Sequence, residues 1–242
     1  MVMSCLGTLY LIPAPLADGP LADTLPRGTL DVVIRLQSFV VEELRTARRY
    51  LSKAGHQGNI DALQFFVLNE HTDPKTWHNM LQPLLEGRDM GLLSEAGLPA
   101  VADPGAALVA LAHQKGIKVS PFVGPSSLML ALMASGLNGQ SFAFAGSLPV
   151  HPQERKERIR QLEKRAVQEN QTQIFIETPY RNVALFGDLL EVCAPHTLLC
   201  IAANLTASDA FVATKTIAQW RAALPPHIHK IPSVFLIGKP LC

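Results

Sequence analysis

Short apolar runs rich in β-branched residues alternate with longer helical patterns over most of this chain, and this alternation constrains the fold more than any other feature. It is typical of α/β layering with mainly parallel strands. The runs are apolar at consecutive positions, as expected where helices cover both faces of a sheet. The expected strands are 8–12, 39–43, 63–68, 90–94, 117–121, 142–144, 172–176, 197–201 and 233–237. The expected helices are 45–54, 74–86, 105–115, 126–135, 152–169, 182–192 and 214–223.

A break in this pattern falls near residues 117–124, where an expected strand runs into a Gly-Pro-Ser-Ser turn and a new series begins. We therefore expect two α/β domains of about equal size, 1–119 and 120–242, which fit the usual range of domain lengths. A cleft between two such domains is the default position for a small-molecule site.

The charge balance excludes one class of function. The chain of 242 residues has 21 Lys and Arg against 20 Asp and Glu, a formal net charge of +1. Binding of polyanions through the overall field is thereby excluded, whereas a local basic patch is not. Segments 45–53 and 155–165 are two such patches for RNA, although acids interleaved in the second also fit an ion-paired solvent face.

Several features of the sequence indicate the cellular compartment of the protein. Every apolar run is shorter than the roughly 20 residues of a membrane helix, so we expect a soluble protein. Segment 1–17 lacks the basic start of a signal peptide, which favours the cytoplasm. The cysteines form no CxxC pair and no Cys/His cluster, so we expect reduced, mostly structural thiols and no metal site. They are Cys5, Cys193, Cys200 and Cys242.

Three loops after expected strands combine small, rigid residues with few charges. Loop 13–19 is rich in Pro and Ala, which lets main-chain groups approach a ligand. In loop 94–104 the acids are Glu95 and Asp103, and Asp103 before a proline favours a helix N-cap over a ligand contact. A loop of this length inside a compact domain is nevertheless typical of a functional segment. Segment 123–127 places two serines at a helix N-terminus, which suits either an anion or a helix cap.

Turn residues with polar side chains also follow strands in the second half of the chain. They occur at 177–181, at 202–206 and just before the last strand at 231–232. Open α/β sheets bind ligands at the carboxyl ends of their strands, where these segments are expected to lie.

These segments, in this order, resemble the tetrapyrrole methylase superfamily. The branch that they resemble most consists of enzymes that methylate a cytidine ribose hydroxyl of small-subunit ribosomal RNA. The resemblance covers nearly the whole chain, and the segment from Ser94 to Gly105, with its Ser-acid-Ala-Gly-x-Pro start and Asp-Pro-Gly end, is specific to that branch. The other matching segments are 9–15, 124–127, 177–181 and 204–206.

The resemblance implies two α/β domains, a homodimer, and S-adenosylmethionine folded into the cleft between the domains. It also implies the cofactor contacts, many of them through the main chain, for which small residues suffice. Carried over by position, the cofactor-binding residues are Pro15, Ala96, Gly97, Leu98, Ser126, Ser127, Thr178, Leu205 and Pro232.

The chain departs from the pattern of this branch at several polar positions. Segment 14–18 replaces a Gly/Asn-rich loop, and Glu43-Leu44-Arg45 replaces Asp-Thr-Arg. Segment 178–181 reads Thr-Pro-Tyr-Arg in place of Ser-Pro-His-Arg, and 203–206 reads Ala-Asn-Leu-Thr in place of Arg-Glu-Leu-Thr. Methylation is thus better supported than ribosomal RNA as its target.

A ribose hydroxyl is a poor nucleophile, so a general base or a polarising cation is expected beside it. The candidate catalytic residues are Glu43, Glu95 and Glu177, and Arg45 and Arg181 are candidates for orienting a phosphate or carboxylate of the substrate. For each of them a solvated or salt-bridged loop charge is the competing interpretation.

Two other functions remain open at this point. One is methyl transfer to a tetrapyrrole or another small anionic metabolite, which would need a cleft lined by arginine rather than a broad basic rim. The other is a protein that binds S-adenosylmethionine without catalysis, which the replaced polar residues would explain. A P-loop nucleotide hydrolase is disfavoured, because the chain has no GxxxxGK[ST] segment.

Overall fold

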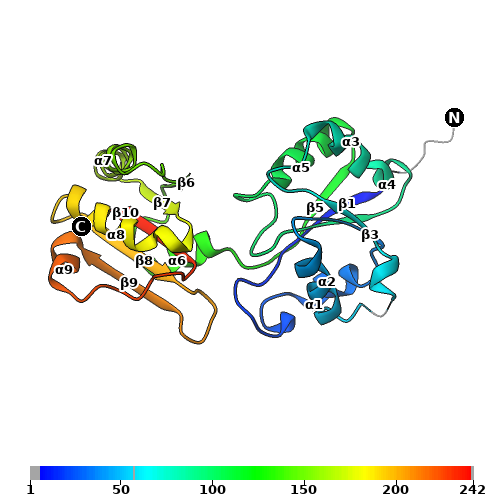
Figure 1. The fold of residues 1–242 in the computed structure, drawn as a ribbon, viewed down its shortest axis with the longest axis horizontal. Helices are drawn as coiled ribbons and strands as arrows, with labels where there is room; N and C mark the ends of the chain where they lie inside the picture. Colours follow the sequence, from blue (N-terminus) through cyan, green and yellow to red (C-terminus); the bar gives the residue numbers. More distant parts are fainter. Residues whose placement is uncertain (1–5, 57, 241–242) are drawn as a thin grey trace. The chain divides into compact units, whose positions relative to one another are not determined.

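The computed structural model describes residues 6–56 and 58–240, which divide into two compact units (Figure 1). One unit ends at Ser126 and the other begins at Ser127. The boundary expected from the sequence, after Val119, lies within strand β5 (Lys118–Pro121). Since β5 pairs with β1 (Thr8–Ile12), the residues that follow the expected boundary still belong to the first sheet.

The first unit is a parallel five-stranded sheet in the order β3-β2-β4-β1-β5. All of its strands run in one direction, so their carboxyl ends lie at the same edge. Its remaining strands are β2 (Ser38–Val41), β3 (Gln64–Val67) and β4 (Met90–Leu93). Its helices are α1 (Arg27–Val33), α2 (Leu44–Lys53), α3 (Trp77–Met80), α4 (Gln82–Leu85) and α5 (Gly105–Gln114), with short 3₁₀ turns η1 (Leu21–Asp23), η2 (Ile60–Ala62) and η3 (Pro74–Thr76).

Helices cover both faces of this sheet, which explains why its central strands are apolar at consecutive positions. Figure 1 shows α1 and α2 on one side of the strands and α3 and α5 on the other. Ile12, Phe39 and Val41 pack in the cluster that includes α1 and α2, whereas Leu9 and Val40 pack with α3 to α5.

The second unit is a mixed sheet in the order β6-β7-β10-β8-β9. Only β6 and β7 pair in parallel, because β10 is inserted antiparallel between β7 and β8, and β9 pairs antiparallel with β8. The expected α/β class is confirmed, whereas the expectation of mainly parallel strands is wrong for this sheet. The strands are β6 (Phe142–Ser147), β7 (Thr172–Ile176), β8 (Leu198–Ala203), β9 (Phe211–Thr216) and β10 (Ser233–Gly238). The helices are α6 (Ser127–Ser135), α7 (Pro152–Gln168), α8 (Asn182–Val192), α9 (Ile217–Ala222) and the 3₁₀ turn η4 (Pro179–Arg181).

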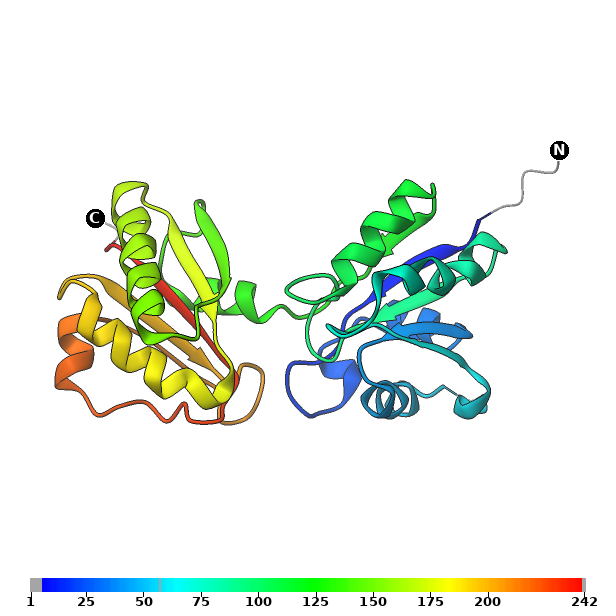
Figure 2. The ribbon, with the colours of Figure 1, turned by 45° about the horizontal axis from the view of Figure 1, so that its top comes forward.

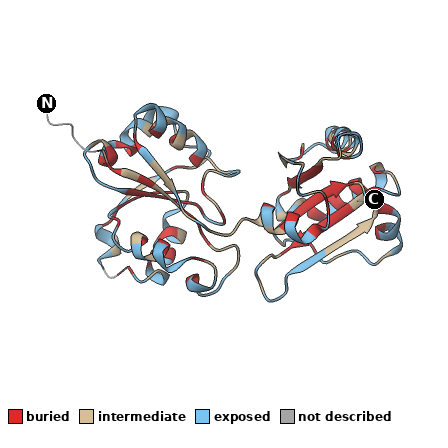
Figure 3. Cartoon of the chain, turned by 180° about the vertical axis from the view of Figure 1, so that it is seen from behind, coloured by how far each residue is buried: buried red, intermediate tan, exposed pale blue. Residues whose placement is uncertain are grey.

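This sheet also has a hydrophobic cluster on each face. Phe175, Ile201 and Phe235 pack against α7, α8 and α9, which Figure 2 shows along that side of the unit. On the opposite face, Ile174 and Cys200 pack against α6. Figure 3 shows the central strands buried, whereas the edge strand β9 is intermediate to exposed.

Two expected helices differ from the observed elements. Residues 214–223 are not one helix, since β9 continues to Thr216, whose side chain and that of Gln219 then cap α9 reciprocally. Residues 74–86 are divided into η3, α3 and α4, and Pro83, which lacks an amide hydrogen, lies in the first turn of α4. In addition, α1 and β9 are elements that the sequence patterns did not predict.

Within the described ranges, no helix is long and apolar enough to cross a membrane. Two of the cysteines, Cys193 and Cys200, are buried free thiols, and burial raises the pKa of Cys193 to about 12. Cys5 and Cys242 lie outside the described residues.

Candidate active site

A cavity of about 260 Å³ lies in the first unit, at the carboxyl ends of β1, β2 and β4 and beside α2. The position of the cavity follows from the topology of the parallel sheet, because the loops after parallel strands gather at one edge of the sheet. The wall combines carboxylates, cations and small loop residues. The lining residues are Ala14, Pro15, Leu16, Ala17, Asp18, Gly19, Leu21, Val41, Glu42, Glu43, Thr46, Ala47, Arg49, Tyr50, Lys53, Leu93, Ser94, Glu95 and Ala96.

A two-residue antiparallel bridge holds the first two candidate cofactor loops side by side. The amide of Ala14 donates to the carbonyl of Gly97 at 2.9 Å, and the amide of Gly97 donates back to Ala14 at 3.0 Å. The hydroxyl of Ser94 also donates to the Gly97 carbonyl. Pro15, from the first loop, is therefore held near Ala96 and Gly97 of the second.

The loop that contains Gly97 has an unusual backbone. Gly97 has φ +75°, and Ala100 and Ala102 adopt left-handed conformations with φ +63° and +60°, which cost energy in residues with a side chain. The carboxylate of Asp103 accepts hydrogen bonds from the amides of Ala100 and Gly105, each at 2.8 Å. Asp103 thus ties this loop to the start of α5. The expected N-cap position of Asp103 is wrong by one residue, because α5 begins at Gly105 and its N-cap is Pro104.

Two contacts from other parts of the unit also hold the first loop, residues 13–19, in place. The buried hydroxyl of Tyr50 in α2 donates to the carbonyl of Pro13 at 3.2 Å. Gly124 lies against the ring of Pro13, so that a Cβ at position 124 would be only 2.2 Å from the Cβ of Pro13. Both contacts hold the main chain just before Pro15.

Glu43, a candidate catalytic residue, is the N-cap of α2. Its carboxylate accepts hydrogen bonds from the amides of Arg45 and Thr46, at 2.8 and 2.7 Å, and from the Thr46 hydroxyl. These hydrogen bonds lower the pKa of Glu43. Its oxygens are thereby engaged with the helix, and Arg45 lies exposed in the first turn, outside the cavity lining.

Glu42 is a lining residue that the sequence analysis did not single out. Its carboxyl is half-buried and, among the residues that the structure describes, has no hydrogen bond or ion pair. Burial, with a smaller contribution from the charges of Asp103 and Glu95, raises the pKa of Glu42 to about 7. The sequence signal for Glu42 was an acid at the end of a strand of four buried residues, but its neighbour Glu43 lies at the same strand end and could not be distinguished from it.

Glu95 lies at the cavity wall as an exposed side chain, next to Ala96. Arg49 and Lys53 provide positive charge along the α2 side of the same wall. Lys53 forms an exposed ion pair with Asp18 at 3.4 Å. Arg49 has no hydrogen bond or ion pair within the described part of the chain.

Three further candidate cofactor residues gather at one edge of the second sheet. Thr178 follows β7, Leu205 follows β8, and Pro232 precedes β10, which lies antiparallel between these two strands. The amide of Asn204 donates to the carbonyl of Pro232 at 2.9 Å, which joins two of these segments directly.

The remaining predicted catalytic acid, Glu177, pairs with Arg181. The Glu177 side chain is fully buried, and its Oε1 accepts hydrogen bonds from the Thr178 amide and the Arg181 guanidinium. Its Oε2 and the Nε of Arg181 are buried without a hydrogen-bond partner among the described residues. The structure thus brings these two predicted residues together as an ion pair beside Thr178, in which Glu177 is buried and Arg181 is partly exposed.

Ser126 and Ser127 lie at the junction of the two units. Ser127 is the first residue of α6, so its position at a helix N-terminus agrees with the sequence analysis. Both side chains are only partly exposed.

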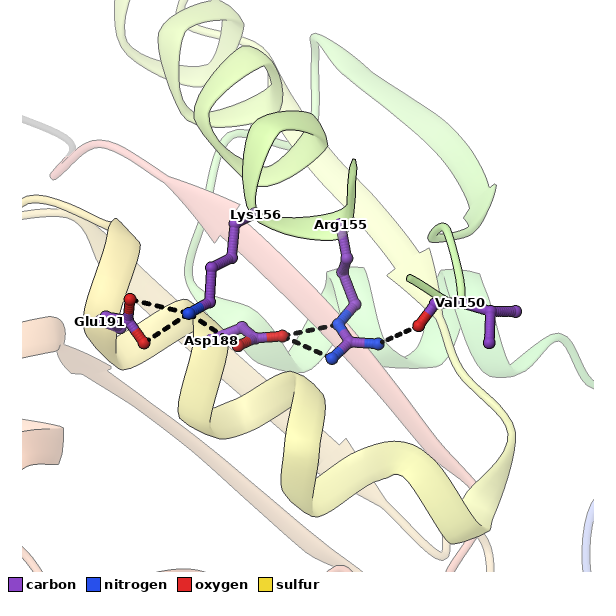
Figure 4. Close-up of polar contacts among 5 residues, drawn as sticks. All are labelled: Val150, Arg155, Lys156, Asp188 and Glu191. Atoms are coloured by element: carbon purple, nitrogen blue, oxygen red, sulfur yellow. Dashed lines mark hydrogen bonds and ion pairs between the residues drawn. The ribbon is translucent and has the colours of Figure 1, made fainter. Parts of the chain in front are cut away.

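Much of the charge on α7 stabilises the second unit. Figure 4 shows Arg155 of α7 pointing at Asp188 of α8, with Nε–Oδ2 at 2.6 Å, while its Nη1 donates to the Val150 carbonyl at 2.9 Å. Lys156 binds both carboxylate oxygens of Glu191 at 2.7 Å. These contacts leave less of segment 155–165 available for RNA than the sequence indicated.

In the described ranges, no group of three or more His, Cys, Asp or Glu side chains is arranged to hold a metal ion.

Comparison with known proteins places the chain among methyltransferases. No protein-family model matches it. It is 34% identical over 198 residues to the Vibrio cholerae protein named ribosomal RNA small subunit methyltransferase I, covering 82% of this chain and 65% of that protein. The Xylella fastidiosa protein of the same name is 32% identical over 204 residues, covering 84% of this chain and 70% of that protein. The Haemophilus influenzae protein of this name is 29% identical over 237 residues, covering 97% of this chain and 80% of that protein.

The chain therefore spans about two thirds of the length of the Vibrio relative. Among solved structures, the methyltransferase CobJ superposes with a TM-score of 0.64 over 98% of this chain and 95% of its own, at 17% identity. This likeness concerns the fold alone, and the expected tetrapyrrole methylase fold is confirmed by it.

Proposed function

The chain belongs to the ribosomal RNA small subunit methyltransferase I family, and on that premise we propose that it methylates a ribose hydroxyl of small-subunit ribosomal RNA. The observation that carries the proposal is the identity of 32% over 204 residues, 70% of a relative of that name. The proposal extends to S-adenosylmethionine as the methyl donor, to a homodimer and to a cytoplasmic location.

The described residues fit such a donor. In the first unit, the bridge between Ala14 and Gly97 holds Pro15 near Ala96, and both of these residues line the cavity. In the second unit, Thr178, Leu205 and Pro232 line one sheet edge. When bound, S-adenosylmethionine supplies a methyl group activated by the positive charge on sulfur.

The chain's own contribution is then to position the acceptor hydroxyl and to remove its proton. Alignment of reacting groups lowers a barrier by up to about 7–11 kcal/mol in well-oriented cases. A general base contributes a further factor of about 10²–10⁴ in rate. The carboxylates of the cavity, and not the buried carboxylate of Glu177, are accessible for that task.

The test is transfer of labelled methyl from S-adenosylmethionine to small ribosomal subunits from cells that lack this methylation. We expect label in the small-subunit RNA, and nuclease digestion followed by mass spectrometry to place it on ribose. Fully methylated subunits are the matched control and remain unlabelled.

Other outcomes select the alternatives. Label in a small-molecule extract, with none in subunits, would favour the metabolite methyltransferase. Calorimetric binding of S-adenosylmethionine with no labelled product in either sample would favour a binding protein without catalysis. Label on a base rather than on ribose would contradict the proposed acceptor group but not the substrate.

Exposed apolar side chains in the second unit support the homodimer. Met133 of α6 is 79% exposed, and Phe142 and Phe144 of the edge strand β6 are 41% and 37% exposed. Apolar surface of this kind is commonly covered by a subunit contact. Sedimentation velocity at micromolar concentration would measure a dimer, and a monomer at all concentrations would contradict it.

A further inference from the structure

We infer that the cavity beside β2 binds the acceptor nucleotide, with Glu42 removing the proton of the ribose hydroxyl and Arg49 holding the adjoining phosphate. The inference rests on the proposed function and deepens it by assigning the acceptor site. It goes beyond the cofactor contacts, because it concerns side chains that belong to none of the candidate cofactor segments.

The position of the cavity fits an acceptor site. Pro15 and Ala96, two candidate cofactor residues, are themselves part of its wall. A group bound in the cavity therefore lies beside the loops that are proposed to hold the methyl donor. Its volume of about 260 Å³ lies just below the ~300–1,000 Å³ of pockets for drug-sized ligands, which suits one nucleoside unit rather than a tetrapyrrole macrocycle.

Glu42 is the carboxylate best placed to act as a base. Glu43 is engaged as the helix cap, and Asp103 accepts two backbone hydrogen bonds. Glu177 is buried in an ion pair. Glu95 is exposed at the wall, whereas Glu42 is half-buried and, within the described residues, makes no hydrogen bond. Its pKa of about 7 is that of an efficient base near neutral pH.

Of the two cations in the wall of the cavity as described, Arg49 is the one without an ion pair. Its neighbour Arg48 pairs with Asp61 at 3.3 Å and lies over the ring of Phe65. Arg49 instead lines the cavity and has no ion-pair partner in the part of the chain described. A ribose hydroxyl in RNA lies next to a phosphodiester. A carboxylate for the hydroxyl and a guanidinium for the phosphate, in one wall, therefore match the two groups of the acceptor nucleotide.

The hydroxyl oxygen forms the new C–O bond with a lone pair, and its proton passes to the Glu42 carboxylate. The bond between methyl and sulfur breaks, and its electron pair stays on sulfur, which becomes a neutral thioether. Glu42 then returns the proton to solvent.

Other charged or titratable groups lie near Glu42, at the cavity wall or beside it. Two of them, Glu95 and Asp103, raise its pKa. The groups in the wall are Asp18 from the loop after β1, Glu43, Arg49, Tyr50 and Lys53 from the start and body of α2, and Glu95 from the loop after β4.

The test compares Glu42→Gln and Arg49→Ala with wild type in single-turnover and steady-state methylation of undermethylated small ribosomal subunits. Glu70→Gln, an exposed loop acid, and Arg35→Ala, an exposed arginine outside the wall and outside segments 45–53 and 155–165, are the matched controls. Thermal melts and calorimetry with S-adenosylmethionine test whether each variant is folded and binds the donor as wild type does.

We expect the wild-type rate to rise with pH around pH 7, and Glu42→Gln to lower the rate by about 10²–10⁴-fold and to abolish this rise. Arg49→Ala is expected to raise KM for subunits several-fold with kcat unchanged. It should also reduce, by about one, the slope of the logarithm of the binding constant against the logarithm of salt concentration. Glu42→Asp keeps a carboxylate and is expected to recover part of the rate, and it replaces Glu42→Gln should that variant not fold.

The outcomes separate the two proposals. If wild type labels ribose and Glu42→Gln keeps both the wild-type rate and its pH profile, the assignment of Glu42 is overturned while the proposed function stands. An unchanged KM in Arg49→Ala likewise overturns the phosphate contact. If wild type itself transfers no methyl group to subunits, both proposals fail.

Discussion

Two adjacent acids at the end of β2 have opposite electrostatic environments. Glu43 also borders the cavity, but its carboxylate accepts hydrogen bonds from the free amides of the first turn of α2, which stabilise its negative charge. Glu42 faces the cavity, where partial burial and two nearby acids disfavour its charge. One position along the chain thus separates a structural carboxylate from one suited to proton transfer.

Glu43→Ala is expected to lower the free energy of unfolding, because the Arg45 and Thr46 amides lose their acceptor. Glu43→Asp should recover most of it, since a shorter carboxylate still caps a helix. Urea denaturation followed by circular dichroism measures both. The rate of methylation per folded molecule should stay near that of wild type, so a large loss of rate at unchanged stability would show that Glu43 acts in the reaction.

Glu42→Gln is expected to make the protein more stable above pH 7 but not below pH 4.5. As the pH rises from 4.5 to about 7, the unfolded chain releases the proton of Glu42 while the folded protein retains it. The unfolded state then binds fewer protons, so wild-type stability falls across this window because of Glu42. The glutamine side chain does not titrate in this range, so the variant lacks this fall in stability. Urea denaturation of both proteins from pH 4.5 to 8 measures the difference, and a difference that is independent of pH would contradict the raised pKa.

At the scale of elements, the second unit depends on a buried ion pair between α7 and α8. Arg155 is 4% exposed and Asp188 is 9% exposed, and the guanidinium also donates to the Val150 carbonyl (Figure 4). Removing one partner of such a pair leaves a buried charge without compensation, whereas replacing both by apolar groups is often neutral.

Asp188→Ala is therefore expected to destabilise the protein by about 3–5 kcal/mol. The double variant Arg155→Met with Asp188→Leu should be much less destabilised. Glu191→Ala, on the same helix but exposed, is the control and should change stability far less. Equal losses for Asp188→Ala and Glu191→Ala in chemical denaturation would refute the importance of burial here.

The first candidate cofactor loop depends on close packing at Gly124. In Gly124→Ala, the new Cβ would meet the Pro13 ring at 2.2 to 2.3 Å, so the chain before Pro15 must move. We expect a loss of about 1–3 kcal/mol in stability and weaker binding of S-adenosylmethionine by calorimetry. Gly139→Ala is the control, because nothing lies within 4 Å of its added Cβ. Wild-type donor affinity in Gly124→Ala would show that this contact does not position the loop.

At the scale of the whole molecule, each unit buries its own hydrophobic clusters on both faces of its own sheet. The chain segment of each unit is continuous and has the length of an ordinary domain. Domains of this kind fold alone when their core is complete within one segment.

A fragment of residues 127–242 is accordingly expected to fold by itself. It should show near-ultraviolet circular dichroism from packed aromatic residues such as Trp220, and a cooperative thermal transition. A fragment with helical far-ultraviolet signal but neither of these features would be a molten globule and would show that the second unit needs the first.

The sequence predicted most elements because their signals are local. The strand at Thr8–Ile12 and the helix at Asn182–Val192 have the predicted bounds, since each is an apolar run between clear turn residues. Strand β9 was missed because its residues are half-exposed and lack the apolar run of a central strand. Helix α1 was missed because it is short and includes Gly28.

By itself, the sequence determined the α/β layering, the loops at the carboxyl ends of the strands and, through their order, the family, which the relatives confirm. Only the tertiary structure decided the antiparallel insertion of β10 and the different roles of Glu42 and Glu43. Strand order depends on pairing between distant segments. The pKa of Glu42 depends on burial and on Glu95 and Asp103, which lie far along the chain and approach Glu42 only in the folded protein.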